Sequence, residues 1–151
     1  MRKKGYFPLL LVLFLMAMTL PAVEPEEYLL MKPIQDSLNT GDFNHLKNHS
    51  ENKVSINFDP PFELNGYLYI DKIIEEFNRK FEQYKTNKIQ WISAHLEEKF
   101  AVQSLNLILK NKRSERTANY KFIFFLRKVI TIVNTKEIKE WKIYYLRGLR
   151  I

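Results

Sequence analysis

The chain has 151 residues, of which 46% are hydrophobic, and a formal net charge of +7. This length allows one domain with its own core and is too short for two ordinary domains. It contains no cysteine, which excludes disulfides, thiol nucleophiles and cysteine-ligated metals. We therefore expect a domain held together by core packing alone.

Residues 1–23 have the composition of a secretory signal peptide. Arg2, Lys3 and Lys4 precede an uncharged apolar run at residues 8–20, and the small Ala22 lies at the exit of that run. The run is shorter than the roughly 20 apolar residues that a spanning helix needs. We expect cleavage, which leaves one domain at residues 24–151 that is exported to the periplasm or secreted. The alternative is an uncleaved N-terminal membrane anchor, and only then do we expect membrane contact.

The stretch "LNTGDF" predicts a hinge between two short helices. Ile34 and Leu38 lie four residues apart on one helix face. Gly41 suits the C-terminal cap, where glycine tolerates a left-handed backbone. Asp42 can then cap the next helix by accepting bonds from free N–H groups. The glycine-centred turn therefore indicates a fold and not an active site.

The next residues predict a strand followed by the clearest helix of the chain. Val54, Ile56 and Phe58 alternate with polar neighbours, and Pro60 and Pro61 end this strand. "NGYLY" at residues 65–69 is interpreted as a turn. The helix after this turn carries one continuous apolar stripe. Its members are Ile70, Ile73, Ile74, Phe77, Phe81 and Tyr84.

The second half of the chain predicts four strands, at residues 88–97, 100–110, 118–133 and 139–151. Short polar turns join them, so we expect an antiparallel meander. A helical half followed by such a meander is the order of an α+β domain.

The third of these strands is apolar on both faces. Either helices cover one face and a partner subunit covers the other, or the strand is central and buried. We favour a homodimer through the sheet, because large exposed apolar patches usually mark contact sites. One face carries Tyr120, Phe122, Phe124 and Leu126, and the other carries Ile123 and Phe125.

This order of elements resembles the nuclear transport factor 2-like superfamily, the cone fold that ketosteroid isomerases and cystatin-like proteins share. More narrowly, it resembles an uncharacterised family of exported bacterial proteins. The likeness covers residues 34–151 and rests on a "GD" turn, part of a "GxYS" segment, a histidine in the first long strand and a closing "L-x-I". The matching positions are Gly41, Asp42, Gly66, Tyr67, His95, Leu149 and Ile151. The resemblance implies N-terminal helices packed on a curved antiparallel sheet, and it brings no known function.

The resemblance also implies a pocket inside the cone, but no catalytic residue is predicted. The isomerases of the superfamily use carboxylates and a tyrosine, and its dehydratases use a His–Asp pair. Residues 120–133 and 141–151 contain no carboxylate at all. Whether the protein is an enzyme therefore stays uncertain, and the sequence favours a protein that is not one.

Four residues are candidates for binding a small apolar ligand: Tyr67, Trp91, His95 and Tyr145. At a strand period of two, Trp91, Ser93 and His95 share one face. If that face lines the cone, His95 and Trp91 would meet a ligand there. The alternative is that His95 is a hydrogen-bonded core or rim residue and that the aromatic residues are plain core.

We expect no metal, no cofactor and no nucleic acid. His45 and His49 are spaced i, i+4, but a zinc site needs a third ligand. None of the four glycines lies in a phosphate-binding motif. The basic residues are interpreted as solvated surface rather than as a dedicated nucleic-acid surface.

Three hypotheses about function result, of which one, a membrane-tethered scaffold, requires that residues 1–23 stay attached. The first is a non-catalytic exported domain that binds a small ligand or a protein partner, or acts as a dimeric module. The second is a cone-pocket enzyme of the isomerase or dehydratase type, with His95 as the base in general acid–base catalysis.

Overall fold

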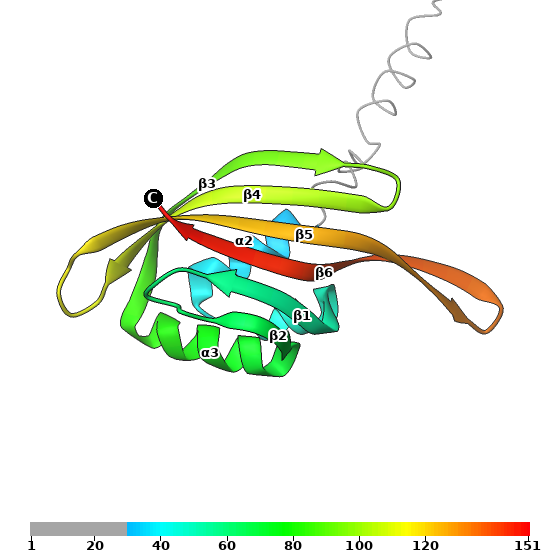
Figure 1. The fold of residues 1–151 in the computed structure, drawn as a ribbon, viewed down its shortest axis with the longest axis horizontal. Helices are drawn as coiled ribbons and strands as arrows, with labels where there is room; N and C mark the ends of the chain where they lie inside the picture. The colour runs from blue at the N-terminus through cyan, green and yellow to red at the C-terminus, as the bar shows by residue number, and fades with distance from the viewer. Residues whose placement is uncertain (1–29) are drawn as a thin grey trace, which may run out of the picture.

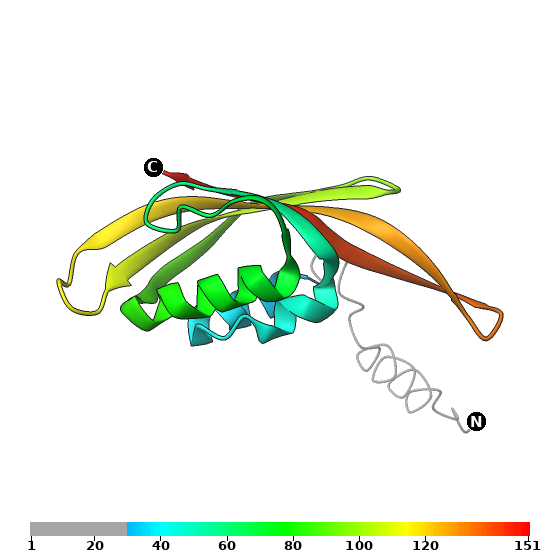
Figure 2. The ribbon, with the colours of Figure 1, turned by 60° about the horizontal axis from the view of Figure 1, so that its bottom comes forward.

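One curved sheet with helices on a single face makes up the part of the chain that the computed structural model describes, residues 30–151. The strand order is β2-β1-β6-β5-β4-β3. Figure 1 shows the six strands side by side, and Figure 2 shows α2 and α3 together beneath the sheet. We call the face that the helices cover the inner face and the opposite one the outer face. The α+β class predicted from the sequence is confirmed.

The predicted helical hinge is confirmed. Helix α2 spans Met31–Thr40 and ends at Gly41, which has φ 74° and donates its N–H to the carbonyl of Ser37. The carboxylate of Asp42 accepts the N–H of Asn44 at 3.0 Å, but Asp42 is not the N-cap as predicted, because Phe43 lies between it and the helix and is the N-cap residue. The second helix, η2 at Asn44–His49, is a 3₁₀ helix. None of the helices within residues 30–151 is long and apolar enough to cross a membrane.

The predicted long helix is also confirmed as α3, Ile70–Gln83. Its apolar stripe faces the sheet, because Ile70, Ile73, Ile74, Phe77 and Phe81 are all buried. The chain then passes directly from α3 into a strand.

The strands are β1 (Ser50–Phe58), β2 (Asn65–Tyr69), β3 (Tyr84–Leu96), β4 (Phe100–Asn111), β5 (Thr117–Val133) and β6 (Lys136–Arg150). The β3–β6 meander is antiparallel throughout, as predicted. Two features were not predicted. "NGYLY" is a strand rather than a turn, and β1 lies parallel to β6, which makes the sheet mixed.

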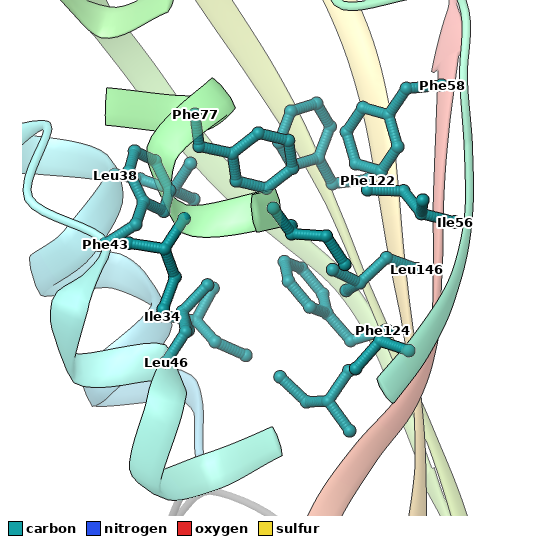
Figure 3. Packing of buried hydrophobic residues seen from close by; sticks show 14 of the residues in the cluster. Ile34, Leu38, Phe43, Leu46, Ile56, Phe58, Phe77, Phe122, Phe124 and Leu146 are labelled. Atoms are coloured by element: carbon teal, nitrogen blue, oxygen red, sulfur yellow. The ribbon is translucent and has the colours of Figure 1, made fainter. Parts of the chain in front are cut away.

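The core lies between the inner face and the helices. Figure 3 shows side chains of α2, η2 and α3 meeting those of β1, β5 and β6. In β5 the residues that point inward alternate along the strand, as the pattern at Tyr120, Phe122, Phe124 and Leu126 predicted. Their neighbours Ile123 and Phe125 lie on the outer face and are only partly buried.

The ends of β5 and β6 continue past the other strands as a two-stranded ribbon (Figures 1 and 2). We call residues 129–140 the arm. A two-residue turn joins its strands, with Asn134 at φ 49° and Thr135 at φ 66°. Positive φ at both turn residues is the geometry of a type I′ hairpin.

Candidate functional site

A bulge in β3 separates two of the predicted ligand-binding residues. Trp91 lies opposite Leu105, but Ser93 lies opposite the neighbouring Ser104, because the register shifts between them. One extra residue in a strand moves the residues after it to the other face. The prediction that Trp91, Ser93 and His95 share a face is therefore wrong.

Trp91 lies on the inner face, against the helices. It is half-buried against the core, and its indole N–H donates to the side-chain oxygen of Gln35 on α2 at 3.1 Å. His95 lies on the outer face, opposite Val102. Its side chain is 72% exposed, and its Nε2 is 3.2 Å from Oε1 of Glu97. Trp91 and His95 cannot contact one ligand.

The other predicted residues lie with His95 on the outer face. The pairing of the six strands places them in one row, in which each residue lies directly opposite the next. We call it the outer row. From β2 to β3 it contains Tyr67, Ser55, Tyr145, Phe125, Val102 and His95. Neighbouring strands lie about 4.8 Å apart, so the ends of the row are too far apart to hold one small ligand.

The centre of the outer row is aromatic. The rings of Phe125 and Tyr145 stack with their centroids 4.9 Å apart. A bulge in β6 beside this pair inserts Tyr144, whose ring meets that of Phe100 at 6.4 Å and lies under the guanidinium of Arg127 at 5.6 Å. Tyr144 is thus a member of this surface that a strict alternation would place on the inner face.

Charged side chains contact one another and the rings at the margin of the aromatic centre. The Arg127 guanidinium makes a two-pronged ion pair with the Glu51 carboxylate, and this hydrogen bonding raises the pKa of Arg127. On the other side, the ammonium of Lys53 lies over the rings of Tyr69 and Tyr67, at 4.5 and 5.7 Å. These contacts order an aromatic surface that remains open to solvent.

An open depression of about 390 Å³ lies on this face between β2, β1 and β6. Its lining includes Ser55, Asn57, Gly66, Tyr144 and Tyr145. Tyr145 therefore contributes to the depression, Tyr67 lies beside it, and His95 and Trp91 take no part. The four candidates were predicted to line a pocket inside the cone, and three of them, Tyr67, Tyr145 and His95, lie on the outer face instead.

A cluster of aromatic rings lies on the inner face, between the sheet and α3. Phe62, from the loop between β1 and β2, contacts rings from β1, α3 and β5, with centroids 5.5–6.3 Å away. The phenol of Tyr120 donates to the carbonyl of Pro60 at 2.9 Å, and burial raises its pKa. Within residues 30–151, no aspartate, glutamate or histidine is buried. Within the described residues, these rings pack against one another with no buried acidic or histidine side chain among them.

A second pocket, of about 240 Å³, opens at one end of the sheet. Tyr84, Tyr120, Arg116 and Arg150 contribute to its lining, between the Pro60–Pro61 loop and the β4–β5 hairpin. The sequence interpretation missed it, because residues from four distant segments meet there. The two guanidinium groups make its mouth basic.

His45 and His49 do not form a metal site with other described residues. No group of three or more His, Asp or Glu side chains in residues 30–151 is placed to hold a metal ion. His49 is partly buried instead, and burial together with the nearby Lys142 ammonium lowers its pKa.

Several solved structures share this fold. A DUF4783 family protein from Bacteroides uniformis superposes with a TM-score of 0.60 at 13% identity, over 80% of this chain and 95% of that one. A ketosteroid isomerase-like protein from Erwinia carotovora atroseptica gives 0.59 at 14%, over 85% and 98%. A nuclear transport factor 2-like protein of unknown function in nutrient uptake, from Rhodospirillum rubrum, gives 0.60 at 11%, over 84% and 99%.

No protein-family model matches the chain, and no curated protein matches it. Identities this low establish a shared fold and carry no activity across. The expected architecture is confirmed by the curved sheet, the helices on one face and these neighbours together. This chain has the nuclear transport factor 2-like fold.

Proposed function

We propose that this protein is an exported, non-catalytic module that associates with a second copy of itself through the outer face of its sheet. The observation that carries the proposal is the outer row, an aromatic and aliphatic centre that no described helix covers. On the inner face, by contrast, aromatic and aliphatic side chains of the strands pack against those of the helices. The fold thus presents its usable apolar surface on the outside.

The outer face has the composition of a contact surface. Phe125, Val102 and Ile123 form an apolar centre, and Asn57 and Arg147 lie at its margin. An apolar centre with a polar rim is typical of protein interfaces. The strands range from five residues in β2 to 17 in β5, and at a spacing of about 4.8 Å their body outside the arm offers a plane on the order of 900 Å². That is close to the roughly 800 Å² per partner of a stable interface.

A second copy satisfies this surface better than a small molecule does. The outer row crosses the whole sheet, and a small ligand in the 390 Å³ depression would cover only its β2–β6 end. A two-fold related copy brings the same apolar centre against itself. The isomerase- or dehydratase-type alternative gains no specific support, although one neighbour, from Rhodopseudomonas palustris, is described as a putative isomerase.

A single charge on the outer row tests the proposal. Phe125→Lys should lower the average mass of the purified protein towards that of a monomer, because burying an unpaired ammonium at the centre of the contact is costly. The control is Asn39→Lys, which adds the same charge at an exposed position on α2, on the helix side of the sheet and away from both the outer face and the arm. This control should keep the mass of the unaltered protein.

The masses are best measured by light scattering in about 1 M salt, which screens exposed ion pairs but leaves apolar burial in place. A monomeric unaltered protein, or a Phe125→Lys variant with unchanged mass, would refute the outer-face contact. Export is tested separately, by determining the N-terminus of the protein recovered from the producing cells. A start near residue 24 supports cleavage, and an intact Met1 supports the anchored alternative.

A further inference from the structure

The arm is an exposed ribbon with free edges. Each residue at positions 130–140 is exposed, including Ile130, Ile132 and Ile138 at 56%, 72% and 42%. The two strands of the arm pair with each other, from Val129 opposite Glu140 to Val133 opposite Lys136. An isolated two-stranded ribbon is only marginally stable in water, and its unpaired backbone groups are a template for another strand. The edges of the arm are therefore positions at which a partner strand can form backbone hydrogen bonds.

The edge formed by β6 carries alternating charges around one apolar residue. Its sequence is Lys136, Glu137, Ile138, Lys139, Glu140. If a second copy of this strand lies antiparallel with Ile138 opposite Ile138, then Lys136 lies opposite Glu140 and Glu137 lies opposite Lys139. Every charged side chain then faces the opposite charge, and opposite charges stabilise cross-strand pairs.

We propose that the arms of two copies pair edge to edge through β6, antiparallel and centred on Ile138. The resulting contact is isologous, since each copy supplies the same residues. It joins two ribbons into a four-stranded sheet and satisfies the free backbone groups of both β6 edges.

Other registers bring like charges together. Centring on Glu137 or Lys139 places that residue opposite its own copy. If the centre of the pairing lies between two residues, either Lys136 lies opposite Lys139 or Glu137 lies opposite Glu140. A parallel arrangement in register pairs all four charges with themselves. Like charges directly opposite are destabilising, so the charge pattern selects one arrangement and disfavours pairing with an arbitrary strand.

The body of the protein leaves room for this pairing at β6. The first β6 residue that pairs with β1 is Ile143, opposite Ser50, so the edge beside residues 136–140 is not occupied by β1. The β5 edge is more restricted, because the N–H of Lys128 already donates to the carbonyl of Lys99. In a comparable arrangement centred on Thr131, the turn of the partner's arm would meet that occupied position.

The side chains are available for the contact. Lys136, Glu137 and Lys139 make no ion pair with any residue in 30–151. The carboxylate of Glu140 lies 2.8 Å from the ammonium of Lys142 on its own strand, and its second oxygen remains for a partner. The arm contact uses a surface separate from the outer row, so the two contacts together would assemble more than two copies.

Two double variants with the composition and net charge of the natural chain test the register. Lys136→Glu with Glu137→Lys places like charges opposite each other in all four pairs, and arm pairing should be lost. Glu137→Lys with Lys139→Glu keeps charges of opposite sign in all four cross-strand pairs, and arm pairing should persist. All three substituted positions are exposed, so the fold should survive in both variants.

Arm pairing is measured by cross-linking, because the chain has no cysteine of its own. Ile138→Cys introduced into the full-length protein should form a disulfide between copies under mild oxidation, since its opposite Cβ would lie about 5 Å away. Thr131→Cys, at the neighbouring position in the hairpin, should not, because three strand spacings would separate the two sulfurs. The Ile138→Cys cross-link should vanish in the first double variant and remain in the second.

Three results would overturn the proposal: equal cross-linking in both double variants, none at Ile138→Cys in either the unaltered or the control background, or preferential cross-linking at Thr131→Cys. The last would assign the contact to the β5 edge. Adding Phe125→Lys separates this contact from the outer face. Cross-linking through Ile138→Cys should persist there whether or not the outer-face contact exists.

Discussion

Gly148 shows how one residue controls the packing of the inner face. It lies in β6 between Phe58 of β1 and Phe122 of β5. A methyl group at this position would lie 2.6 Å from Cε1 of Phe58, much closer than a van der Waals contact. The Phe58 ring is itself enclosed by Phe62, Phe77 and Phe122, so it cannot move aside freely.

We therefore expect Gly148→Ala to lower the free energy of unfolding by about 1–3 kcal/mol, the usual cost of overpacking a core. Urea denaturation of the purified variant measures this. Arg147→Ala is the control, because that side chain points outward and exposed surface changes usually stay within about 0.5 kcal/mol. Equal midpoints for the two variants would show that the Phe58 ring is not confined.

His49 makes stability depend on pH. Burial lowers its pKa from the ordinary 6.5, the Lys142 ammonium and His45 lower it further, and Glu140 opposes them. The unfolded chain therefore takes up a proton at this residue before the folded chain does. The contribution to stability is present above the unfolded pKa and is lost as pH falls through the folded pKa.

We expect His49→Gln to reduce the loss of stability between about pH 7 and pH 5, the range in which histidine titrates. The measurement is the urea midpoint at both pH values for the natural chain and the variant. His45→Gln, at an exposed position one helical turn away, is the control and should leave the pH dependence closer to that of the natural chain. An identical slope with and without His49 would contradict the assignment.

Among the elements, the arm has a turn that contains an unfavourable residue. Thr135 has φ 66°, and a left-handed backbone costs an L-residue roughly 1–2 kcal/mol, with β-branched residues least suited. Glycine adopts this conformation freely but loses about 0.5–1 kcal/mol of backbone freedom on folding. Asn-Gly is also the preferred pair for this turn type.

Thr135→Gly should therefore stabilise the arm by about 0.5–1 kcal/mol, which corresponds to amide hydrogen exchange about two- to fivefold slower in the arm. Exchange rates measured by NMR report this locally. Thr135→Ala keeps a Cβ in the left-handed region and should gain less. Faster exchange in the glycine variant would show that the turn is not strained in solution.

The bulge in β3 shows why the candidate site was only partly predicted. A strict period of two placed Trp91 and His95 on one face, and the register shift after Trp91 separated them. No residue type near Ile92 predicts a bulge, because the irregularity depends on how β3 pairs with β4. Tyr67 and Tyr145 were expected as pocket residues for a small ligand, and their place in the outer row depends on β1 lying between β2 and β6.

For the molecule as a whole, the packing of the interior decides between a contact module and a pocket protein. Phe62 comes from a loop yet is only 6% exposed, and it contacts rings on three elements. Phe62→Ala should lower the free energy of unfolding by about 3–5 kcal/mol, because it leaves a cavity in the core. An apolar cavity of that kind binds benzene.

Benzene should therefore raise the thermal midpoint of Phe62→Ala, in proportion to the occupancy of the cavity, and leave the natural chain unchanged. Tyr67→Ala, at a 66% exposed position, should show neither the destabilisation nor the benzene response. A comparable response of the natural chain would reveal an interior that is open, and the pocket-enzyme hypothesis would then regain support.

The local structure of this protein is encoded in short stretches of its sequence. The apolar stripe of α3, the Gly41 cap and the alternation in β5 depend on helix and strand geometry over a few neighbouring residues, and each was predicted correctly. The order of these elements was also enough to indicate the fold, because few architectures accommodate helices followed by a long meander.

Which residues share a surface, in contrast, was settled by long-range pairing. The parallel pairing of β1 with β6, the strand formed by "NGYLY" and the bulges after Trp91 and around Tyr144 each depend on partners far away in the chain. Backbone hydrogen bonds across a sheet can form with any strand that offers a free edge. The choice among edges depends on the packing of the whole core. That packing leaves the outer row on the outer face and places Phe62 and its neighbouring rings on the inner face.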